Sequence, residues 1–474
     1  MGLLAGMSAA ETALPRQVVQ ALERAQVPVE AAAFVVTDLA TGRTRLSHRA
    51  AAAMNPASVT KLVTTSAALE LLGPAHTWTT TVLADGDLQG ELLRGQLVMR
   101  GGGDPKLVIE RLQALLAQVQ SSGVKAIEGD IVLDRQLFRP PPVRAGDFDG
   151  EPLRPYNAQP DALLVNFKSM VLTFTPDAAQ RKALIKMEPA LAGVKVDDAV
   201  PLAQGKRCED WRAALKAELD QPQQVQFRGR YPAACGERIW PTAYIEPETF
   251  AARAIEAAWR AQGGGLSGRV RDATAQEQAA LARSGSISGA RPVLRLDVPS
   301  LPLTEIVQDV NKFSNNVMAQ QLFYTLGLRG APAEAGTLAG ARAVVLDWWR
   351  QRLPSSGLPV LDNGSGLSRM ERISAQALSD LLERMARSPV AADLLASLPV
   401  AGVDATMRNR ARAVAGQAWL KTGSLRDVSA IAGYAQSQSG RRYAVVGLIN
   451  HDNAGPARLA LDALVQWVVQ QEAP

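Results

Sequence analysis

The stretch Pro56-Ala57-Ser58-Val59-Thr60-Lys61-Leu62 opens a segment in which apolar residues recur at helical spacing as far as Gly73-Pro74. Residues three apart share one face of a helix, so Lys61 lies one turn beyond Ser58. A serine hydroxyl needs a base within hydrogen-bond reach to act as a nucleophile at neutral pH. We therefore expect Ser58 at the start of a buried helix, with the Lys61 amine as its candidate base.

This spacing is weak evidence alone, because Ser122-Gly123-Val124-Lys125 repeats it. The second copy precedes a glycine and no apolar helix follows it, so it is predicted to be a surface turn. A lysine can accept a proton near neutral pH only if burial and a second ammonium lower its pKa. For Lys61 to act as the base, a second ammonium must therefore lie near it.

Ser314-Asn315-Asn316 breaks the apolar pattern between 303–310 and 317–326, which predicts an exposed turn between two helices. Ser314 and Asn316 are two residues apart, so both side chains can point into one cleft. The serine can pass a proton to a leaving group, and the amide can accept from Lys61 while donating to a substrate carbonyl. Taken alone, the string is more typical of an asparagine-rich helix cap.

Lys421-Thr422-Gly423 falls on a predicted strand beside a hairpin. Lys421 is the candidate second ammonium, and with Thr422 it suits a free substrate carboxylate. Gly423 is expected to let a substrate backbone approach closely, and the N–H groups of Ser424 and Ser58 to stabilise an oxyanion. Without the other strings, an ordinary surface strand is the better explanation of Lys421-Thr422-Gly423.

The 474-residue composition, 47% hydrophobic and 20% charged, predicts more than one buried core. The net charge of +5 comes from scattered basic residues, which fits an anionic polymer or simply a mildly basic soluble protein. There is no nucleic-acid motif. The three histidines, His48, His76 and His451, lack metal-ligand spacing, which disfavours a zinc site or a Ser-His-Asp triad.

Cys208 and Cys235 are the only cysteines, and the spacing leaves open a disulfide or two buried thiols. A disulfide would place the protein outside the cytoplasm. No apolar run reaches the 18 or so residues of a membrane span. The first residues lack the basic and apolar regions of a signal peptide, so the start looks truncated or engineered, and export must be inferred from elsewhere.

The three strings, in this order and on these elements, resemble those of β-lactamases and penicillin-binding proteins. The 256 positions from Ser58 to Ser314 point to the class C low-molecular-mass group, the penicillin-binding protein 4 family of D-alanyl-D-alanine carboxypeptidases and endopeptidases. The middle residue of the second string is Asn315, whereas aspartate is commoner at this position in the proteins that it resembles. Further matching segments are Met54-Asn55-Pro56-Ala57-Ser58, Gly103-Asp104-Pro105, Asp362-Asn363-Gly364-Ser365-Gly366-Leu367-Ser368-Arg369, Leu398-Pro399-Val400-Ala401-Gly402 and Lys421-Thr422-Gly423-Ser424-Leu425.

The resemblance implies an α/β (α+β) fold, with an antiparallel sheet flanked by helices and a nested β-rich insertion of two domains. Residues 10–78 and 246–474 are expected to form the catalytic domain. Residues 79–103 and 163–245 are expected to form the inserted β-rich domain, with 104–162 as a second domain nested within it.

By the same resemblance, Ser58 attacks the penultimate D-Ala carbonyl of a peptidoglycan stem peptide, and Lys61 takes its proton. The leaving group receives a proton through Ser314 and Lys421, and water resolves the acyl-enzyme. Carboxypeptidase and endopeptidase activity and acylation by penicillin are implied, with no metal or organic cofactor. Lys421 and Thr422 would bind the terminal carboxylate of the substrate.

Peptidoglycan peptides and β-lactams are the expected partners, and no nucleic acid is expected. Membrane association is expected to be peripheral at most, and the sequence leaves open whether the protein forms a homodimer. Because peptidoglycan lies outside the cytoplasmic membrane, the resemblance implies a periplasmic or otherwise extracytoplasmic location. That location favours a disulfide between Cys208 and Cys235. Two alternatives remain, a β-lactamase or esterase on the same fold and a non-catalytic cell-wall binding protein.

Overall fold

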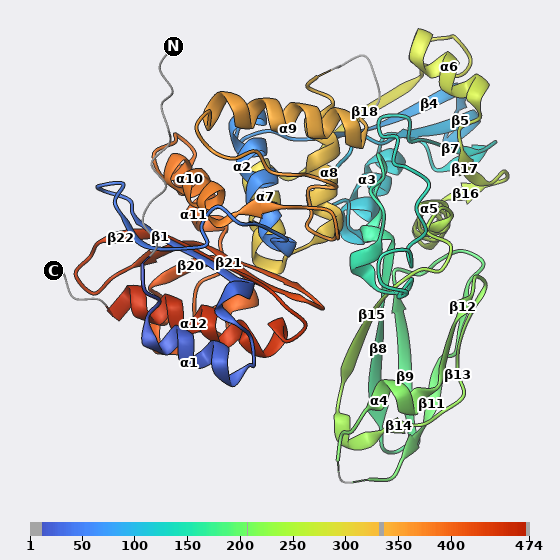
Figure 1. Cartoon of the computed structure of the whole chain (residues 1–474). Helices are drawn as coiled ribbons and strands as arrows, with labels where there is room; N and C mark the ends of the chain where they lie inside the picture. The colour runs from blue at the N-terminus through green and yellow to red at the C-terminus, as the bar shows by residue number, and fades with distance from the viewer. Residues whose placement is uncertain (1–11, 206, 331–335, 471–474) are drawn as a thin grey trace. The chain divides into compact units, whose positions relative to one another are not determined.

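The computed structural model describes residues 12–205, 207–330 and 336–470. Their packing divides the chain into two compact units, one from Met1–His76 with Pro302–Pro474 and the other from Thr77–Leu301 (Figure 1). All the residues expected in the site belong to the first unit.

The first unit is built on an antiparallel sheet with the strand order β2-β1-β22-β21-β20. Alternate residues of a strand face opposite sides, and Phe34 and Val36 pack with Leu461 and Leu464 under the two terminal helices. On the other face, Thr37 Oγ1 lies 2.9 Å from the Ser379 hydroxyl of α10. The elements are β1 (Ala32–Asp38), β2 (Thr44–His48), β20 (Ala418–Leu425), β21 (Val428–Gln436), β22 (Arg442–Asn450), α1 (Arg16–Arg24), α10 (Ala375–Ala386) and α12 (Ala454–Gln470).

A cluster of helices packs beside this sheet. Every residue of α8 and most of α2 are buried, including polar side chains such as Gln321 and Thr65. A short turn of helix, Ala57–Thr60, precedes α2 and contacts β20 and β21. The remaining elements are α2 (Lys61–Leu72), α7 (Leu303–Phe313), α8 (Asn316–Gly327), α9 (Leu338–Arg352), α11 (Ala391–Ser397), β3 (Ala53–Met54) and β19 (Ile373–Ser374), the last two paired with each other.

In the second unit, a mixed sheet has helices on both faces. The alternation is visible along β5, where Leu97 and Met99 pack toward α3 and α5 while Val98 packs with Leu281 of α6. Its elements are β4 (Thr79–Gln89), β5 (Leu92–Arg100), β6 (Ala126–Glu128), β7 (Ile131–Asp134), β16 (Gly265–Leu266), β17 (Val270–Asp272), β18 (Leu294–Pro299), α3 (Ile109–Ser121), α5 (Phe250–Ala261) and α6 (Ala275–Ser284).

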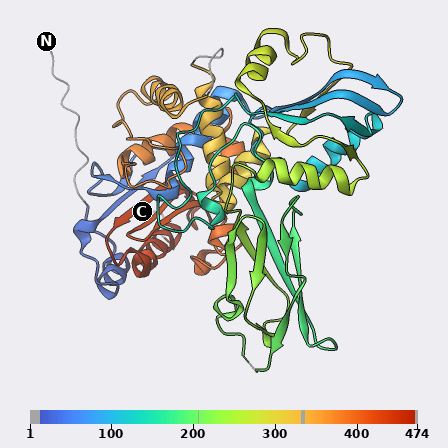
Figure 2. The ribbon, with the colours of Figure 1, turned by 90° about the vertical axis from the view of Figure 1, so that its right-hand side faces the viewer.

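Two further sheets complete this unit, as a lobe that Figure 2 shows away from the β4–β5 hairpin. The Phe174 ring packs against Phe227 and Tyr231 at centroid distances of 5.3 and 5.6 Å. Cys208 and Cys235 form a disulfide here. The elements are β8 (Ser169–Asp177), β9 (Lys182–Glu188), β11 (Ala199–Ala203), β14 (Tyr231–Pro232) and β15 (Arg238–Ala243) in one sheet, β10 (Lys195–Val196), β12 (Ala217–Gln221) and β13 (Gln224–Phe227) in the other, and α4 (Trp211–Leu215).

The packing divides the chain at other positions than the expected domain boundaries. Residues 246–301, expected in the catalytic domain, lie in the second unit because β18 pairs with β4 and β17 with β7. Within that unit, β6 and β7 from 104–162 share a sheet with β5 from 79–103. Both differences arise from strand pairings between segments distant in sequence, which local pattern does not report. The division into a catalytic domain and two nested inserted domains stays a prediction.

Candidate active site

Ser58 and Lys61 lie at the junction of the Ala57–Thr60 turn and α2, as the helical spacing predicted. Lys61 Nζ is 3.0 Å from Ser58 Oγ. The lysine is completely buried, whereas Ser58 is partly exposed. A hydroxyl open to a substrate is thus hydrogen-bonded to an amine that water does not reach.

Asn55 positions this turn. Its side-chain Oδ1 accepts from the N–H of Ala57 at 2.8 Å, and its Nδ2 donates to the carbonyl of Ser368 at 2.9 Å. Its backbone N–H and carbonyl bond the side chain of Asn450, at the end of β22, at 2.8 and 3.0 Å. The serine turn is therefore attached to both the sheet and the 362–369 loop.

The Ser314–Asn316 turn joins α7 to α8, as predicted, but it is not exposed as expected: Ser314 and Asn315 are only partly exposed and Asn316 is buried, because its side chain bonds the buried Lys61. Ser314 adopts a left-handed conformation with φ +57°, which ends α7. Asn315 caps α8, its side chain accepting from the N–H of Met318 at 3.1 Å. Since Asn315 fills the capping role, Asn316 is left to accept from Lys61 Nζ with its Oδ1 at 2.6 Å.

Lys421 extends from β20 and is also completely buried. Its Nζ donates to Ser314 Oγ at 2.9 Å and to the carbonyl of Thr422 at 2.8 Å. Thr422 Oγ1 donates to Thr406 Oγ1 at 2.9 Å. Two hydrogen-bonded groups result, one around each lysine.

Gly423 and Ser424 follow on the same strand. A Cβ at Gly423 would lie 2.5 Å from the carbonyl oxygen of Pro56. The glycine is thus required for close contact between β20 and the serine turn, a reason that differs from the expected approach of a substrate backbone. Ser424 is exposed.

The electrostatics of the two amines follow from their burial. Burial lowers the pKa of Lys61 well below its ordinary value, the charge of Lys421 lowers it further, and the charge of Glu371 opposes both. Burial lowers the pKa of Lys421 to about 7. A neutral amine near neutral pH can accept a proton, so Lys61 can serve Ser58 as a base.

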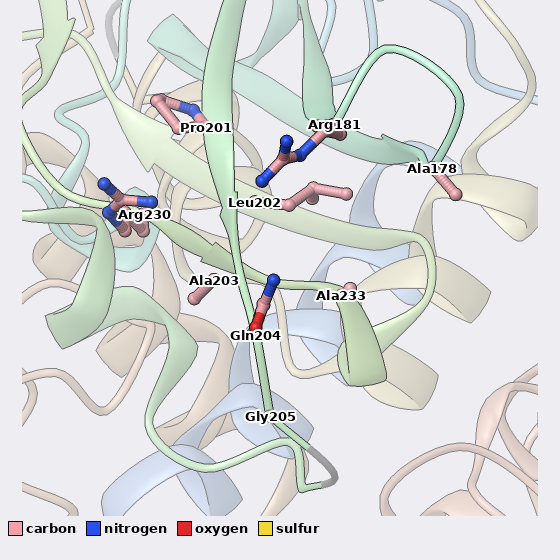
Figure 3. Close-up of a pocket in the computed structure, with 9 residues that line it drawn as sticks. All are labelled: Ala178, Arg181, Pro201, Leu202, Ala203, Gln204, Gly205, Arg230 and Ala233. Carbon is pink, nitrogen blue, oxygen red and sulfur yellow. The ribbon is translucent and has the colours of Figure 1, made fainter.

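The Ser122 copy of the spacing lies at the end of α3, where Ser122 Oγ donates to the carbonyl of Gln118 at 2.8 Å. It is an exposed surface turn, as predicted. Figure 3 shows a pocket in the second unit, lined by residues such as Arg181 and Arg230. None of the expected site residues lines this pocket.

A model of the D-Ala-D-Ala carboxypeptidase 3 (S13) family matches residues 14–471. The chain belongs to this family. It is therefore a hydrolase of the D-Ala-D-Ala carboxypeptidase type, and the family expected from the sequence motifs is confirmed.

The chain is also similar to a known carboxypeptidase and to two solved structures. The chain is 31% identical over 451 residues to the D-alanyl-D-alanine carboxypeptidase of Actinomadura sp. (strain R39), covering 90% of this chain and 79% of that protein. The crystal structure of penicillin binding protein 4 from Haemophilus influenzae matches with a TM-score of 0.74 at 22% identity, covering 97% of this chain and 100% of that one. Its complex with a β-lactam matches with a TM-score of 0.69 at 22% identity, over 96% and 100%. This likeness confirms the expected fold class.

Sequence reasoning gave no role to several residues that contact the site in this S13 chain. The carbonyl of Ser365 accepts from Lys61 Nζ, and Thr406 bonds Thr422. Glu371 is buried beside the loop that carries Ser365. The motif over Asp362–Arg369 marks this loop in the sequence, but a backbone carbonyl and a carboxylate outside the motif leave no such signal.

Among the residues described, no group of three His, Cys, Asp or Glu side chains is arranged to hold a metal ion. The same residues include no helix that is long and apolar enough to cross a membrane.

Proposed function

We propose that the protein is a serine-type D-Ala-D-Ala carboxypeptidase and DD-endopeptidase that acts on peptidoglycan through an acyl-enzyme on Ser58. The observation that carries this proposal is the fully buried Lys61 amine, 3.0 Å from Ser58 Oγ, with a pKa lowered by burial and by Lys421. A buried neutral amine in contact with an accessible hydroxyl suits nucleophilic catalysis without histidine.

In acylation, Lys61 takes the Ser58 proton as Oγ attacks the penultimate D-Ala carbonyl. Asn316, which accepts from Lys61 in the free protein, orients the amine and can donate to a substrate carbonyl. The N–H groups of Ser58 and Ser424 would stabilise the oxyanion, each donor being worth roughly 2.7–4 kcal/mol. The tetrahedral intermediate then expels the leaving amine.

The leaving amine is protonated through the Ser314 hydroxyl, which the Lys421 amine contacts at 2.9 Å. Lys421 and Thr422 bind the terminal carboxylate of the substrate, with Gly423 keeping this strand close to the serine turn. A bound carboxylate would favour the charged form of Lys421 and so keep its proton available. Water then cleaves the acyl ester and restores Ser58.

Penicillin presents a similar carbonyl and carboxylate, so we expect it to acylate Ser58. The relative from Haemophilus influenzae, which has been crystallised with a β-lactam, supports this expectation. The proposed substrate, peptidoglycan, lies outside the cytoplasmic membrane, and disulfides form in oxidising compartments. Both this and the Cys208–Cys235 disulfide support a periplasmic or otherwise extracytoplasmic site of action.

The test is labelling with fluorescent penicillin followed by mass spectrometry of the adduct. Ser58→Ala should abolish labelling, and Lys61→Ala should abolish it while circular dichroism shows a retained fold. Ser122→Ala is the matched control, because it removes the serine of the same spacing on a surface turn, and it should label as the wild type does.

Equal labelling of wild type and Ser58→Ala would refute the acyl-enzyme and favour a non-catalytic cell-wall protein. An adduct that hydrolyses within seconds would favour a β-lactamase or esterase instead. Incubation with defined pentapeptides and cross-linked dimers, followed by separation of the products, measures the carboxypeptidase and endopeptidase activities separately.

A further inference from the structure

Glu371 is a buried carboxylate, 1% exposed, with no part in the mechanism above. Its Oε1 accepts from three successive backbone N–H groups, those of Asp362, Asn363 and Gly364, at 3.3, 3.2 and 3.2 Å. Hydrogen bonds to a charged acceptor are stronger than those between neutral groups. One side chain thus holds the backbone of this loop.

The loop held by Glu371 touches both partners of the reactive pair. The carbonyl of Ser365 accepts from Lys61 Nζ, and the carbonyl of Gly364 accepts from Thr64 on α2 at 2.6 Å. At Gly366, a Cβ would lie 2.0 Å from the carbonyl oxygen of Ala57, next to Ser58. A shift of this loop would therefore displace the Lys61 amine and the serine turn together.

The charges around Lys61 make Glu371 its main negative neighbour. Lys421 faces it from β20, and Asn316 of α8 is neutral. Three ion pairs lie near the loop and helices: Asp362 with Arg342, Arg369 with Asp427, and Lys312 with Asp404. Arg372, next to Glu371, donates to the carbonyls of Arg369 and Glu371. In its ionised form Glu371 raises the pKa of Lys61, against the effects of burial and Lys421. Burial raises the pKa of Glu371 itself, and the hydrogen bonds from Thr60 and from the loop amides favour its charged form.

We propose that Glu371 is a positioning residue for Lys61: it fixes the Asp362–Gly366 loop so that the Ser365 carbonyl receives the amine, and it supplies the buried negative charge that acts on Lys61. The proposal rests on the proposed function, because it assigns Glu371 a part in tuning the base of that reaction.

Glu371→Gln separates charge from shape, since the amide keeps an acceptor oxygen at the same reach. The reactive form of Lys61 is neutral, so the acylation rate rises with pH as Lys61 loses its proton. Without the Glu371 charge the pKa of Lys61 falls, and the acidic limb of the rate–pH profile should move to lower pH. The measurement is the rate constant of labelling by fluorescent penicillin across pH.

Glu371→Ala removes the acceptor altogether. We expect faster hydrogen–deuterium exchange at the amides of 362–364, and a loss of acylation rate of about 10²-fold, the scale that follows a misplacement of about 1 Å. Exchange is read by mass spectrometry and does not depend on activity. If the wild type is not acylated by penicillin, the proposed function fails while the exchange still tests the loop support.

Glu70→Gln is the matched control, because Glu70 is a nearly buried carboxylate of α2 that pairs with Arg352 and Arg384 instead of the loop. It should lower the melting temperature without moving the acidic limb or the exchange of 362–364. The proposal is overturned if Glu371→Gln leaves the limb where the wild type has it, or if Glu371→Ala leaves the loop amides as protected as in the wild type.

Discussion

Gly366 is the position where a single methyl group should separate the fold from the activity of this protein. It adopts φ +82°, and an added Cβ would lie 2.0 Å from the carbonyl oxygen of Ala57 and 2.7 Å from the amide nitrogen of Ser58. These are backbone atoms and cannot turn aside as a flexible side chain can. To restore a separation of about 3 Å, the loop or the serine turn must move by about 1 Å.

The cost of Gly366→Ala has two parts. A non-glycine residue in a left-handed conformation costs about 1–2 kcal/mol, and overpacking typically adds about 1–3 kcal/mol. We therefore expect a loss of about 2–5 kcal/mol in the free energy of unfolding. A displacement of about 1 Å at the reacting groups should lower the acylation rate by about 10²-fold.

Gly440→Ala provides the control, since Gly440 in the turn between β21 and β22 has φ +81° with nothing within 4 Å of an added Cβ. It should lose only the conformational part, about 1–2 kcal/mol, and acylate at the wild-type rate. Urea denaturation and the rate constant of labelling by fluorescent penicillin measure both effects. The reasoning is refuted if Gly366→Ala acylates normally, or if it loses no more stability than Gly440→Ala.

Two further predictions concern Lys421 and the disulfide. The pKa of Lys421 is lowered from 10.5 to about 7 in the folded protein, so the unfolded chain binds more protons between these values and stability should rise with pH across them. Lys421→Met should flatten part of that slope and raise the melting temperature at pH 7 while abolishing acylation; an unchanged slope would contradict the buried amine. Replacing Cys208 and Cys235 together by alanine opens a cross-link across 27 positions and should cost about 3.5 kcal/mol. Because the disulfide and the site lie in different units, calorimetry should show the loss while labelling of Ser58 continues at the wild-type rate, and a large fall in that rate would argue against separate units.

Local pattern was sufficient for the elements that carry the site. The apolar spacing after Ser58 predicted α2, the break at Ser314–Asn316 predicted the turn between α7 and α8, and alternation predicted the strand of Lys421. These features are set by neighbours a few residues away, which is why they are legible in sequence. The division of the chain into units was harder to predict from sequence, because residues 246–301 join the second unit through pairing with strands more than 100 positions earlier.

The sequence by itself determined the order of the three strings and the elements on which they lie, since helix starts, turns and strand alternation follow from local spacing. Only the tertiary structure decided that Lys61 and Lys421 are both buried, that Asn450 holds the serine turn from 395 positions away, and that Glu371 supports the loop behind the amine. The physical reason is that desolvation and hydrogen bonding of a buried group depend on every element packed around it. The pKa of a lysine, and with it the chemistry of Ser58, therefore belongs to the assembled fold.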